Sequence, residues 1–307
     1  MAEKVIVENG EWNREENRFT YCEALEEGHI LFFPSIPFSM PQEEIDFLLK
    51  QRQSGSAARK NIAYKPQEDR ITNHDTKDAE RLKEVLKNYS KRVSDFCSIL
   101  LSPYANEWKL DYASFRPFQE KGRKLRVRAR NDLLHVDAFP TRPVHGARIL
   151  RFFTNINPVE GRRWITSKSA GDLMKEFGGD KGVAFPASMG SSLKRDFKKW
   201  LKRCGVKVAL RSPYDQFMLQ MHNFLKENET FQRECPKDHW DFPPHSCWAV
   251  FTDQVSHAAL SGQYALEQTF LIPRYALLCP EKAPVSLLER LTGGNMVDTR
   301  LAATLFR

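Results

Sequence analysis

The chain has 307 residues, with 47 Lys and Arg against 39 Asp and Glu and a net charge of +8. No run approaches the roughly 18 apolar residues of a membrane helix, so we expect a globular chain that does not span a bilayer. The first ten residues lack the apolar run of a secretory signal, and six scattered cysteines form no CxxC pair, which favours a reducing, cytoplasmic setting. The positive charge favours an anionic partner, but it does not distinguish nucleic acid from a lipid surface or a polyanionic substrate.

The first third of the chain is predicted to be mainly helical. Ser39 and Gln42 have the spacing of a capping box, which predicts a helix start there. Apolar residues spaced three or four apart from Leu82 to Leu100 predict a longer helix with one buried face. We therefore expect a helical layer over residues of about 40–103.

Further along the chain, apolar and polar residues alternate and β-branched residues are frequent, as is typical of strands. The predicted strands are Leu125–Arg130, Leu133–Asp137, Ala147–Asn157, Cys247–Thr252 and Tyr264–Ile272. A loop is expected over Thr166–Ser192 and helices over Leu193–Cys204 and Tyr214–Asn228, within a helical insertion of about 166–240. With no repeat and no long linker, residues 1–307 are expected to form one domain, a β-sandwich or barrel decorated by helices.

The most specific chemical signal is a His-x-Asp motif, His135 and Asp137, on a predicted strand. The two-residue period of a strand places both side chains on one face, where they can reach one cation. A second copy, His239 and Asp241, exists. In a double-stranded β-helix the third ligand comes about a hundred residues later, beside a closing hairpin, and His257 has that relation only to the first copy. Two histidines and one carboxylate leave three open positions on a metal, which is typical of non-haem Fe(II) oxygenases.

Four sequence strings resemble the bacterial Kdo hydroxylase family. They are SFRP at 114–117, NDLLHVDAFPTR at 131–142, RFFTNINP at 151–158 and FTDQVSHAALSGQYALEQT at 251–269. The resemblance implies an α+β fold with a double-stranded β-helix core (jelly-roll, cupin-like) flanked by helices. It implies an Fe(II)- and 2-oxoglutarate-dependent dioxygenase that uses O2 to hydroxylate C3 of 3-deoxy-D-manno-octulosonic acid (Kdo) in the lipopolysaccharide inner core, on the lipid A precursor. It also implies His135, Asp137 and His257 as the iron ligands, the triad that the motif analysis had reached.

The residue that anchors 2-oxoglutarate is harder to predict. Many oxygenases of this fold use a basic residue about ten positions after the distal histidine, because a guanidinium or ammonium makes charge-assisted hydrogen bonds to a carboxylate. This chain has Glu267 and Gln268 at that spacing. We therefore expect Arg151, on the strand after the motif, to take the role, with Arg116 second and Arg148 third.

Other basic residues are candidates for substrate binding, since Kdo carries a carboxylate and lipid A carries phosphates. Those near the metal strands are Arg126, Arg128, Arg130 and Arg142. The predicted helix Leu193–Cys204 carries six basic residues around an apolar stripe, which is typical of a solvated helix face but also of a helix lying on an anionic membrane surface. The expected location is the cytoplasm, with possible peripheral contact with the cytosolic face of the inner membrane.

Two alternatives stay open at this point. The first is an oxygenase of the same chemistry that acts on nucleic acid or protein, although no nucleic acid partner is expected. The second is a non-catalytic sugar- or lipid-binding barrel that holds a structural metal. His145 and His222 are interpreted as packing residues, and no phosphate-loop, dinucleotide-binding or α/β-hydrolase motif occurs in the sequence.

Overall fold

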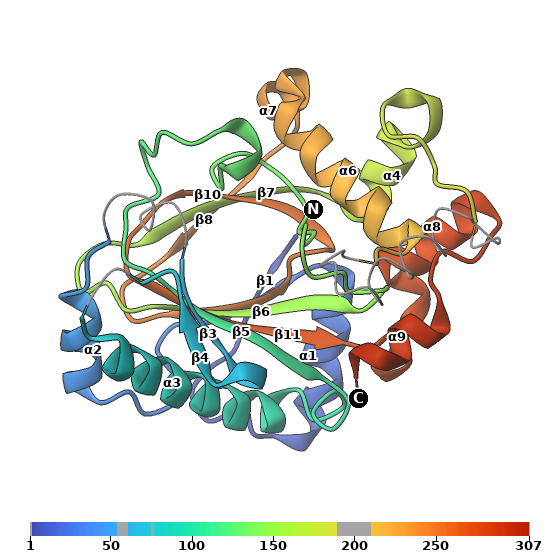
Figure 1. Ribbon diagram of the computed structural model, residues 1–307. Coiled ribbons are helices and arrows are strands. Elements are labelled where there is room, and N and C mark those ends of the chain that lie inside the picture. Colours follow the sequence, from blue (N-terminus) through green and yellow to red (C-terminus); the bar gives the residue numbers. More distant parts are fainter. Residues whose placement is uncertain (1, 54–60, 75–76, 189–209, 307) are drawn as a thin grey trace, which may run out of the picture.

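The computed structural model describes residues 2–53, 61–74, 77–188 and 210–306. Two β-sheets face each other and form a jelly-roll core, as expected (Figure 1). The large sheet has the strand order β1-β2-β9-β6-β11-β5-β3-β4, and the small sheet has the order β10-β7-β8. The strands are β1 (Lys4–Ile6), β2 (Ile30–Phe33), β3 (Ile62–Lys65), β4 (Arg70–Thr72), β5 (Lys109–Arg116), β6 (Arg148–Asn155), β7 (Arg162–Ser169), β8 (Asp238–Phe242), β9 (Cys247–Phe251), β10 (Val255–Ser261) and β11 (Ala265–Ile272).

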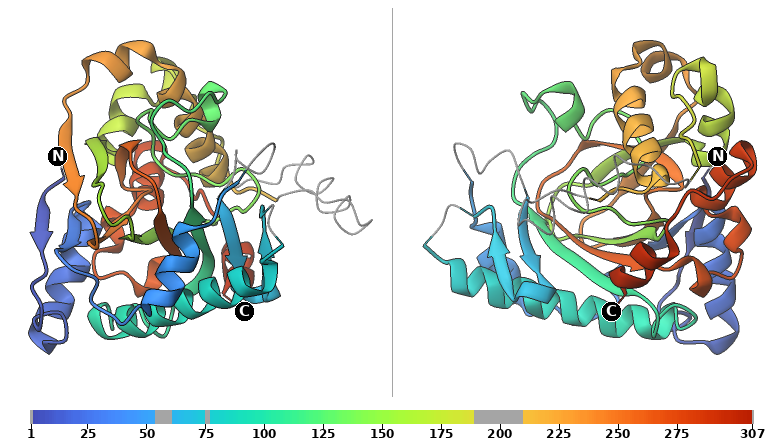
Figure 2. Two further views of the ribbon diagram at one scale, coloured as in Figure 1. Left: turned by 90° about the vertical axis from the view of Figure 1, so that its left-hand side faces the viewer. Right: turned by 45° about the vertical axis from the view of Figure 1, so that its right-hand side comes forward.

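Helices cover both sides of this core. In Figures 1 and 2, α2 and α3 lie under the outer face of the large sheet, whereas α4, α6 and α7 lie on the side of the small sheet. The helices are α1 (Glu15–Glu27), α2 (Gln42–Leu49), α3 (Ala79–Leu100), α4 (Ala170–Phe177), α6 (Pro213–Glu227), α7 (Glu229–Glu234), α8 (Pro284–Thr292) and α9 (Thr299–Leu305). Among the described residues, no helix is long and apolar enough to cross a membrane.

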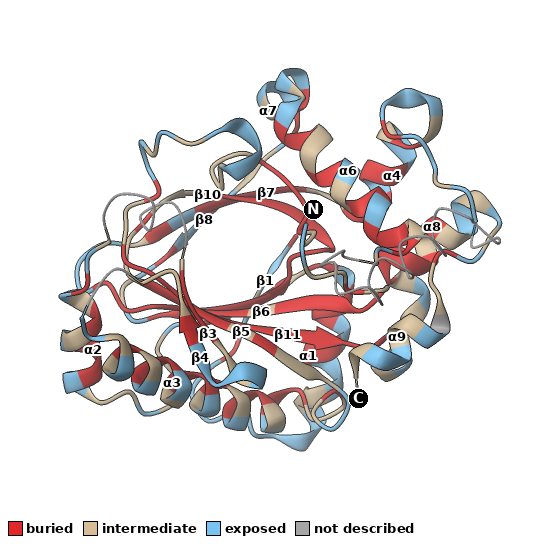
Figure 3. Cartoon of the chain, in the orientation of Figure 1, coloured by how far each residue is buried: buried red, intermediate tan, exposed pale blue. Residues whose placement is uncertain are grey.

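The central strands of the large sheet are buried on both faces (Figure 3). One face packs against α3, whose apolar stripe is buried, and the Tyr89 hydroxyl lies 3.2 Å from Thr154 Oγ1 of β6. The other face packs into the jelly-roll interior, where the Trp248 ring stacks on Phe153 at 5.0 Å and on Phe242 at 4.0 Å. A strand covered on both faces carries apolar residues almost continuously, which explains why these strands are recognisable in the sequence.

Several predicted elements are confirmed with small changes in their bounds. The predicted strands at 147–157, 247–252 and 264–272 correspond to β6, β9 and β11, and the predicted helices at 82–100 and 214–228 correspond to α3 and α6. The predicted helix Leu193–Cys204 lies outside the described residues.

Three local predictions are wrong. The segment Leu125–Arg130 is not a strand: Val127–Ala129 form a 3-10 helix, and Val127 is 44% exposed, because none of the described strands pairs with this segment. The segment Thr166–Ser192 is not simply a loop, since β7 continues to Ser169, whose side chain caps α4. The helix α2 begins after Pro41 and has no side-chain cap, so Ser39 does not form the predicted capping box.

Candidate metal centre and active site

The segment that carries the His-x-Asp motif runs alongside β10. His135 and His257 exchange backbone hydrogen bonds of 3.1 and 2.9 Å, the amide of Ala259 donates to Asn131, and the amide of Asp137 donates to the carbonyl of Thr252. The pairing is reduced to an isolated bridge at His135, so the predicted strand Leu133–Asp137 is extended but not continuous. This pairing brings the motif and the distal histidine together.

The side chains of His135, Asp137 and His257 converge. His135 Nε2 lies 3.7 Å from Asp137 Oδ1, His257 Nε2 lies 4.0 Å from Asp137 Oδ2, and the two imidazole centroids are 4.8 Å apart. Each imidazole Nδ1 is hydrogen-bonded to a backbone carbonyl, that of Leu133 at 2.7 Å and that of Val255 at 3.1 Å. Because Nδ1 then carries the proton, each Nε2 keeps its lone pair for a metal.

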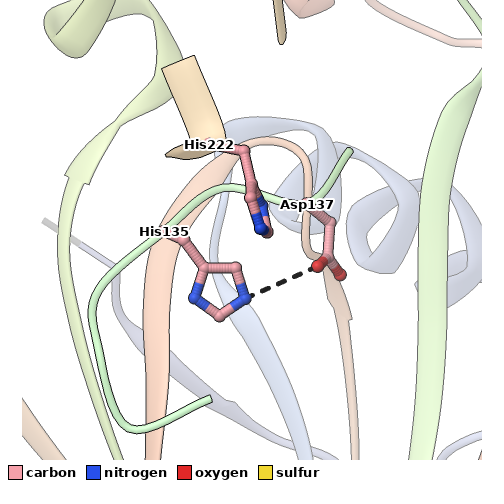
Figure 4. Close-up of side chains that lie close together, drawn as sticks. All are labelled: His135, Asp137 and His222. Atoms are coloured by element: carbon pink, nitrogen blue, oxygen red, sulfur yellow. Dashed lines mark ion pairs between the residues drawn. The ribbon is translucent and has the colours of Figure 1, made fainter. Parts of the chain in front are cut away.

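A fourth residue, His222 of α6, joins this group. Its ring lies edge-on to His135 at 4.8 Å, and one ligating atom each of His135, Asp137 and His222 lie within 4.8 Å of one another (Figure 4). His222 Nδ1 is hydrogen-bonded to the carbonyl of Val136 at 2.8 Å. His222 is therefore part of the centre, and its interpretation as a packing residue at a helix edge is incomplete.

A network of buried ion pairs lies beside the histidines. Glu267 of β11 accepts from Arg116 of β5 at 2.7 Å and lies 3.1 Å from Arg151 of β6. The strand β11 lies between β5 and β6, so one carboxylate reaches both neighbouring strands. Arg151 Nε also lies 3.2 Å from Asp137 Oδ2, and Arg116 pairs with Glu120 at 3.2 Å. Glu267, ten positions after His257, occupies the spacing at which a basic residue would be typical, and it instead pairs with two arginines.

These groups line a cavity of about 420 Å³. His135, Asp137, His222 and His257 are on its wall together with Arg116, Arg151 and Glu267 of the ion-pair network. The other lining residues that bear on the argument below are Arg123, Arg128, Phe139, Arg142, Arg162, Trp164 and Lys226. A buried metal-ligand set next to several guanidiniums suits a small anionic ligand that chelates a metal.

The sequence matches the 3-deoxy-D-manno-oct-2-ulosonic acid (Kdo) hydroxylase family over residues 8–295. The chain belongs to the Kdo hydroxylase family. This membership confirms the family that the sequence strings indicate. No curated protein sequence matches the chain significantly.

Solved structures of a member of the family, the Kdo hydroxylase KdoO, a non-haem Fe(II) α-ketoglutarate-dependent dioxygenase, are similar to this chain. The cobalt(II) complex is 34% identical, with 96% of this chain and 98% of the other covered and a TM-score of 0.83. The complex with α-ketoglutarate and Fe(III) is 33% identical, with 97% and 98% covered and a TM-score of 0.82. The complex with succinate and Fe(III) is 34% identical, with 96% and 98% covered and a TM-score of 0.82. These likenesses confirm the predicted fold and the predicted class, a 2-oxoglutarate-dependent dioxygenase.

The donor set in this Kdo hydroxylase family member fits a divalent metal. Burial would raise the pKa of Asp137, but the neighbouring groups, first of all the Arg151 guanidinium, outweigh it and hold that pKa well below its ordinary value. Burial lowers the pKa of His135 and of His257. Asp137 Oδ2 is buried and accepts no hydrogen bond from the described residues, although it lies beside the Arg151 guanidinium. An ionised carboxylate next to neutral imidazoles is the protonation state that metal ligands require.

The predicted basic residues are divided between the cavity and its surroundings. Arg151 and Arg116 line the cavity, whereas Arg148 does not: its side chain is fully buried and lies 2.9 Å from Asp253. Arg148 is three positions from Arg151 on β6, and an odd spacing places it on the opposite face of the strand. Of the predicted substrate residues, Arg128 and Arg142 line the cavity, while Arg126 is exposed and Arg130 pairs with Asp132 at 2.6 Å, both outside the lining.

Arg162 and Trp164 of β7 are cavity residues that were not predicted from the sequence. The Trp164 ring stacks on His257 at 5.3 Å, and its Nε1 is buried without a hydrogen-bond partner among the described residues. Arg162 is buried and 3.3 Å from Glu120, and burial, partly opposed by Glu120, lowers its pKa to about 10. Its Nε likewise has no hydrogen-bond partner in the part of the chain that the structure describes. Both residues lie between the predicted strand Ala147–Asn157 and the predicted loop Thr166–Ser192, where no strand was predicted, so only their position on β7 at the cavity wall identifies them.

Proposed function

We propose that this protein is an Fe(II)- and 2-oxoglutarate-dependent dioxygenase that uses O2 to hydroxylate C3 of Kdo on the lipid A precursor of lipopolysaccharide. The observation that supports this most strongly is the convergence of His135, Asp137 and His257 beside a cluster of cavity arginines. Bound iron and 2-oxoglutarate would supply the oxygen-insertion chemistry. The chain itself holds the ligands, orients the sugar and keeps water from the reacting carbon.

The iron ligands in this proposal are His135, Asp137 and His257, with His222 as a neighbour. A facial triad leaves three positions, two for the chelating keto acid and one for O2, whereas a fourth protein ligand would leave only two. The backbone pairing of His135 with His257 supports this choice, because both side chains are held by one rigid bridge. His222 comes from a separate helix, α6, which places one of its ring nitrogens near the ligand atoms of His135 and Asp137.

In this proposal the co-substrate lies against the large sheet. Arg151 is the preferred anchor for the distal carboxylate of 2-oxoglutarate, and Arg116 is second. The buried network around them contains four guanidiniums, those of Arg116, Arg123, Arg151 and Arg162, against three carboxylates, those of Glu120, Asp137 and Glu267. The excess of positive charge in a buried site favours a dianionic ligand next to a metal.

We further propose a single domain over residues 1–307 that works in the cytoplasm, with a helical layer at about 40–103, within which the chain also forms β3 and β4, and a helical insertion at about 166–240. The packing of α3 on β6 and the return of the chain from α7 into β8 support one shared core. Arg128 and Arg142, at the cavity wall, are the preferred substrate residues among the basic residues near the motif. Peripheral contact with the anionic face of the inner membrane would bring the enzyme to its lipid-anchored substrate.

The test is formation of succinate by purified protein supplied with Fe(II), 2-oxoglutarate, ascorbate and O2. We expect Kdo-lipid A to stimulate succinate formation, and RNA or peptides not to do so. Mass spectrometry should show a gain of about 16 Da on Kdo, one oxygen atom, as expected of cofactor-driven oxygen insertion. Stimulation by RNA or a peptide instead would favour a different substrate class, and no turnover with any of them would favour a non-catalytic binding protein.

A further inference from the structure

We propose that Lys226 of α6 binds the carboxylate of the sugar acid substrate. This inference rests on the proposed function, because it assigns a residue to the substrate of that same site. The ammonium group would sit on the substrate side of the cavity, opposite the arginines assigned above to 2-oxoglutarate.

Lys226 is a buried cation next to the candidate metal ligands. Only 4% of its surface is exposed, and it lines the same cavity as His135 and Asp137. It follows His222 by one helical turn, and residues four apart on a helix are neighbours, with Cβ atoms about 5–6 Å apart. Because the His222 ring touches His135, the ammonium of Lys226 lies within reach of a ligand at the metal.

The buried ammonium group of Lys226 has few polar contacts that would offset the loss of its hydration. Lys226 Nζ donates one hydrogen bond, of 3.2 Å, to the backbone carbonyl of Arg128. Within the part of the chain that the structure describes, no carboxylate lies within ion-pairing distance of it. Burial lowers the pKa of Lys226 to about 8, although Asp137 and Asp132 oppose the shift, so the group is still mainly charged at neutral pH.

Lys226 differs in this respect from the arginines around it. Each described arginine that lines the cavity has a carboxylate partner: Glu120 for Arg123 and Arg162, Glu227 for Arg128, Asp111 for Arg142, and Glu267 for Arg116 and Arg151. A buried charge without a counter-ion destabilises the folded protein. A site that receives an anionic ligand can keep such a charge, since the ligand supplies the missing partner.

The position of Lys226 favours the sugar over the co-substrate as the source of this anion. Arg116 and Arg151 come from strands of the large sheet, whereas Lys226 comes from a helix on the side of the small sheet (Figure 1). In a 3-deoxy-2-ulosonic acid, the carboxyl carbon C1 and the methylene C3 are both bonded to C2. A sugar whose C3 faces the metal therefore has its carboxylate only a few ångströms away, and it needs a cation close to the metal.

The experiment measures equilibrium binding of the methyl glycoside of Kdo, and separately of 2-oxoglutarate, to the full chain loaded with Co(II). We expect Lys226→Met to weaken binding of the glycoside by tenfold or more and to change 2-oxoglutarate binding by less than twofold. Lys226→Arg should retain most of the affinity. For the methyl ester of the same glycoside, which has no carboxylate, the wild type and Lys226→Met should bind alike.

Lys237→Met is the matched control, because Lys237 Nζ also donates to backbone carbonyls, those of Arg233 and Cys235, but does not line the cavity. Thermal unfolding should show no loss of stability in Lys226→Met, which rules out a purely structural effect. Unchanged glycoside binding would overturn the inference, and so would weaker binding of 2-oxoglutarate alone. If the wild type binds the glycoside but never hydroxylates Kdo-lipid A, the proposed function fails while the binding result for Lys226 still stands.

Discussion

His135 and His257 exchange both of their backbone hydrogen bonds, at 3.1 and 2.9 Å, although they come from distant parts of the chain. The two imidazoles are thus positioned by main-chain pairing and not by flexible side chains alone. Each ring is further held by a hydrogen bond from Nδ1 to a nearby carbonyl. A centre held in this way is preorganised for a metal, because little reorganisation is needed when the metal binds.

Alanine substitution should distinguish the three proposed iron ligands from His222. We expect His135→Ala, Asp137→Ala and His257→Ala each to abolish hydroxylation and to weaken Co(II) binding by at least a hundredfold, because each removes one of three protein ligands. His222→Ala should still bind Co(II) within about tenfold of the wild type, as expected for a neighbour of the ligands. The Co(II) affinity of each variant is measured by titration, followed through the visible absorption of Co(II).

Normal hydroxylation by Asp137→Ala, or loss of the metal in His222→Ala alone, would contradict the assignment. All four variants should stay folded by circular dichroism, since the core is apolar and large.

The requirement for 2-oxoglutarate should depend on Arg151. We expect Arg151→Met to raise the KM for 2-oxoglutarate by tenfold to a hundredfold, since a charge-assisted hydrogen bond contributes about 1.5–3 kcal/mol, and Arg151→Lys to raise it less. Initial rates of succinate formation give both values. Arg163, which is exposed on β7 and does not line the cavity, offers the control variant Arg163→Met. An unaltered requirement in Arg151→Met would transfer the role to Arg116.

The free energy of unfolding of the metal-free protein should decrease at low pH, in part because Glu120 becomes protonated. Burial would raise the pKa of this carboxyl, but the charges of Arg116, Arg162 and Arg123 outweigh it and lower the pKa below 4.5. A carboxylate with a lowered pKa in the folded state stabilises the protein above its unfolded-state pKa and loses that contribution as pH falls through the folded-state value. We expect the free energy of unfolding, from urea titrations, to fall between pH 5 and pH 3, as judged from the ordinary pKa of glutamate of about 4.3. Glu120→Gln should be less stable at pH 7 and should show a shallower fall; equal slopes would contradict the prediction.

Gln232 of α7 should stabilise the segment that carries the proposed metal ligands His135 and Asp137. Its Oε1 accepts from the amide of Leu134 at 2.9 Å, and its Nε2 donates to the carbonyl of Leu134 at 2.9 Å, so the side chain imitates a paired strand. Gln232→Ala leaves both backbone groups without these partners, and we expect a loss of about 1–3 kcal/mol of unfolding free energy together with weaker Co(II) binding. Gln232→Glu keeps the acceptor and should lose less. Co(II) affinity equal to the wild type in Gln232→Ala would show that the segment does not need this support.

The sequence by itself was enough to predict that His135, Asp137 and His257 come together, and it predicted much of the core. The His-x-Asp pattern is local, and the apolar runs of β6, β9 and β11 are strong because those strands are buried on both faces. The distal histidine could be predicted because a jelly roll pairs the two strands in a known order. The segment Leu125–Arg130 was mistaken for a strand because alternating apolar and charged residues show only that the two faces of a segment differ in polarity. It does not show that a partner strand exists.

Only the tertiary structure decided which charged residues meet at the site. Glu267 stands where a cation was expected, and its role became visible only when β11 was found between the strands of Arg116 and Arg151. His222 and Lys226 reach the centre from a helix whose sequence shows an amphipathic pattern and no motif. Periodicity along a chain reports which side of one element is buried. Contacts between elements depend on how distant segments pair and pack, and a single sequence carries no local signal for that.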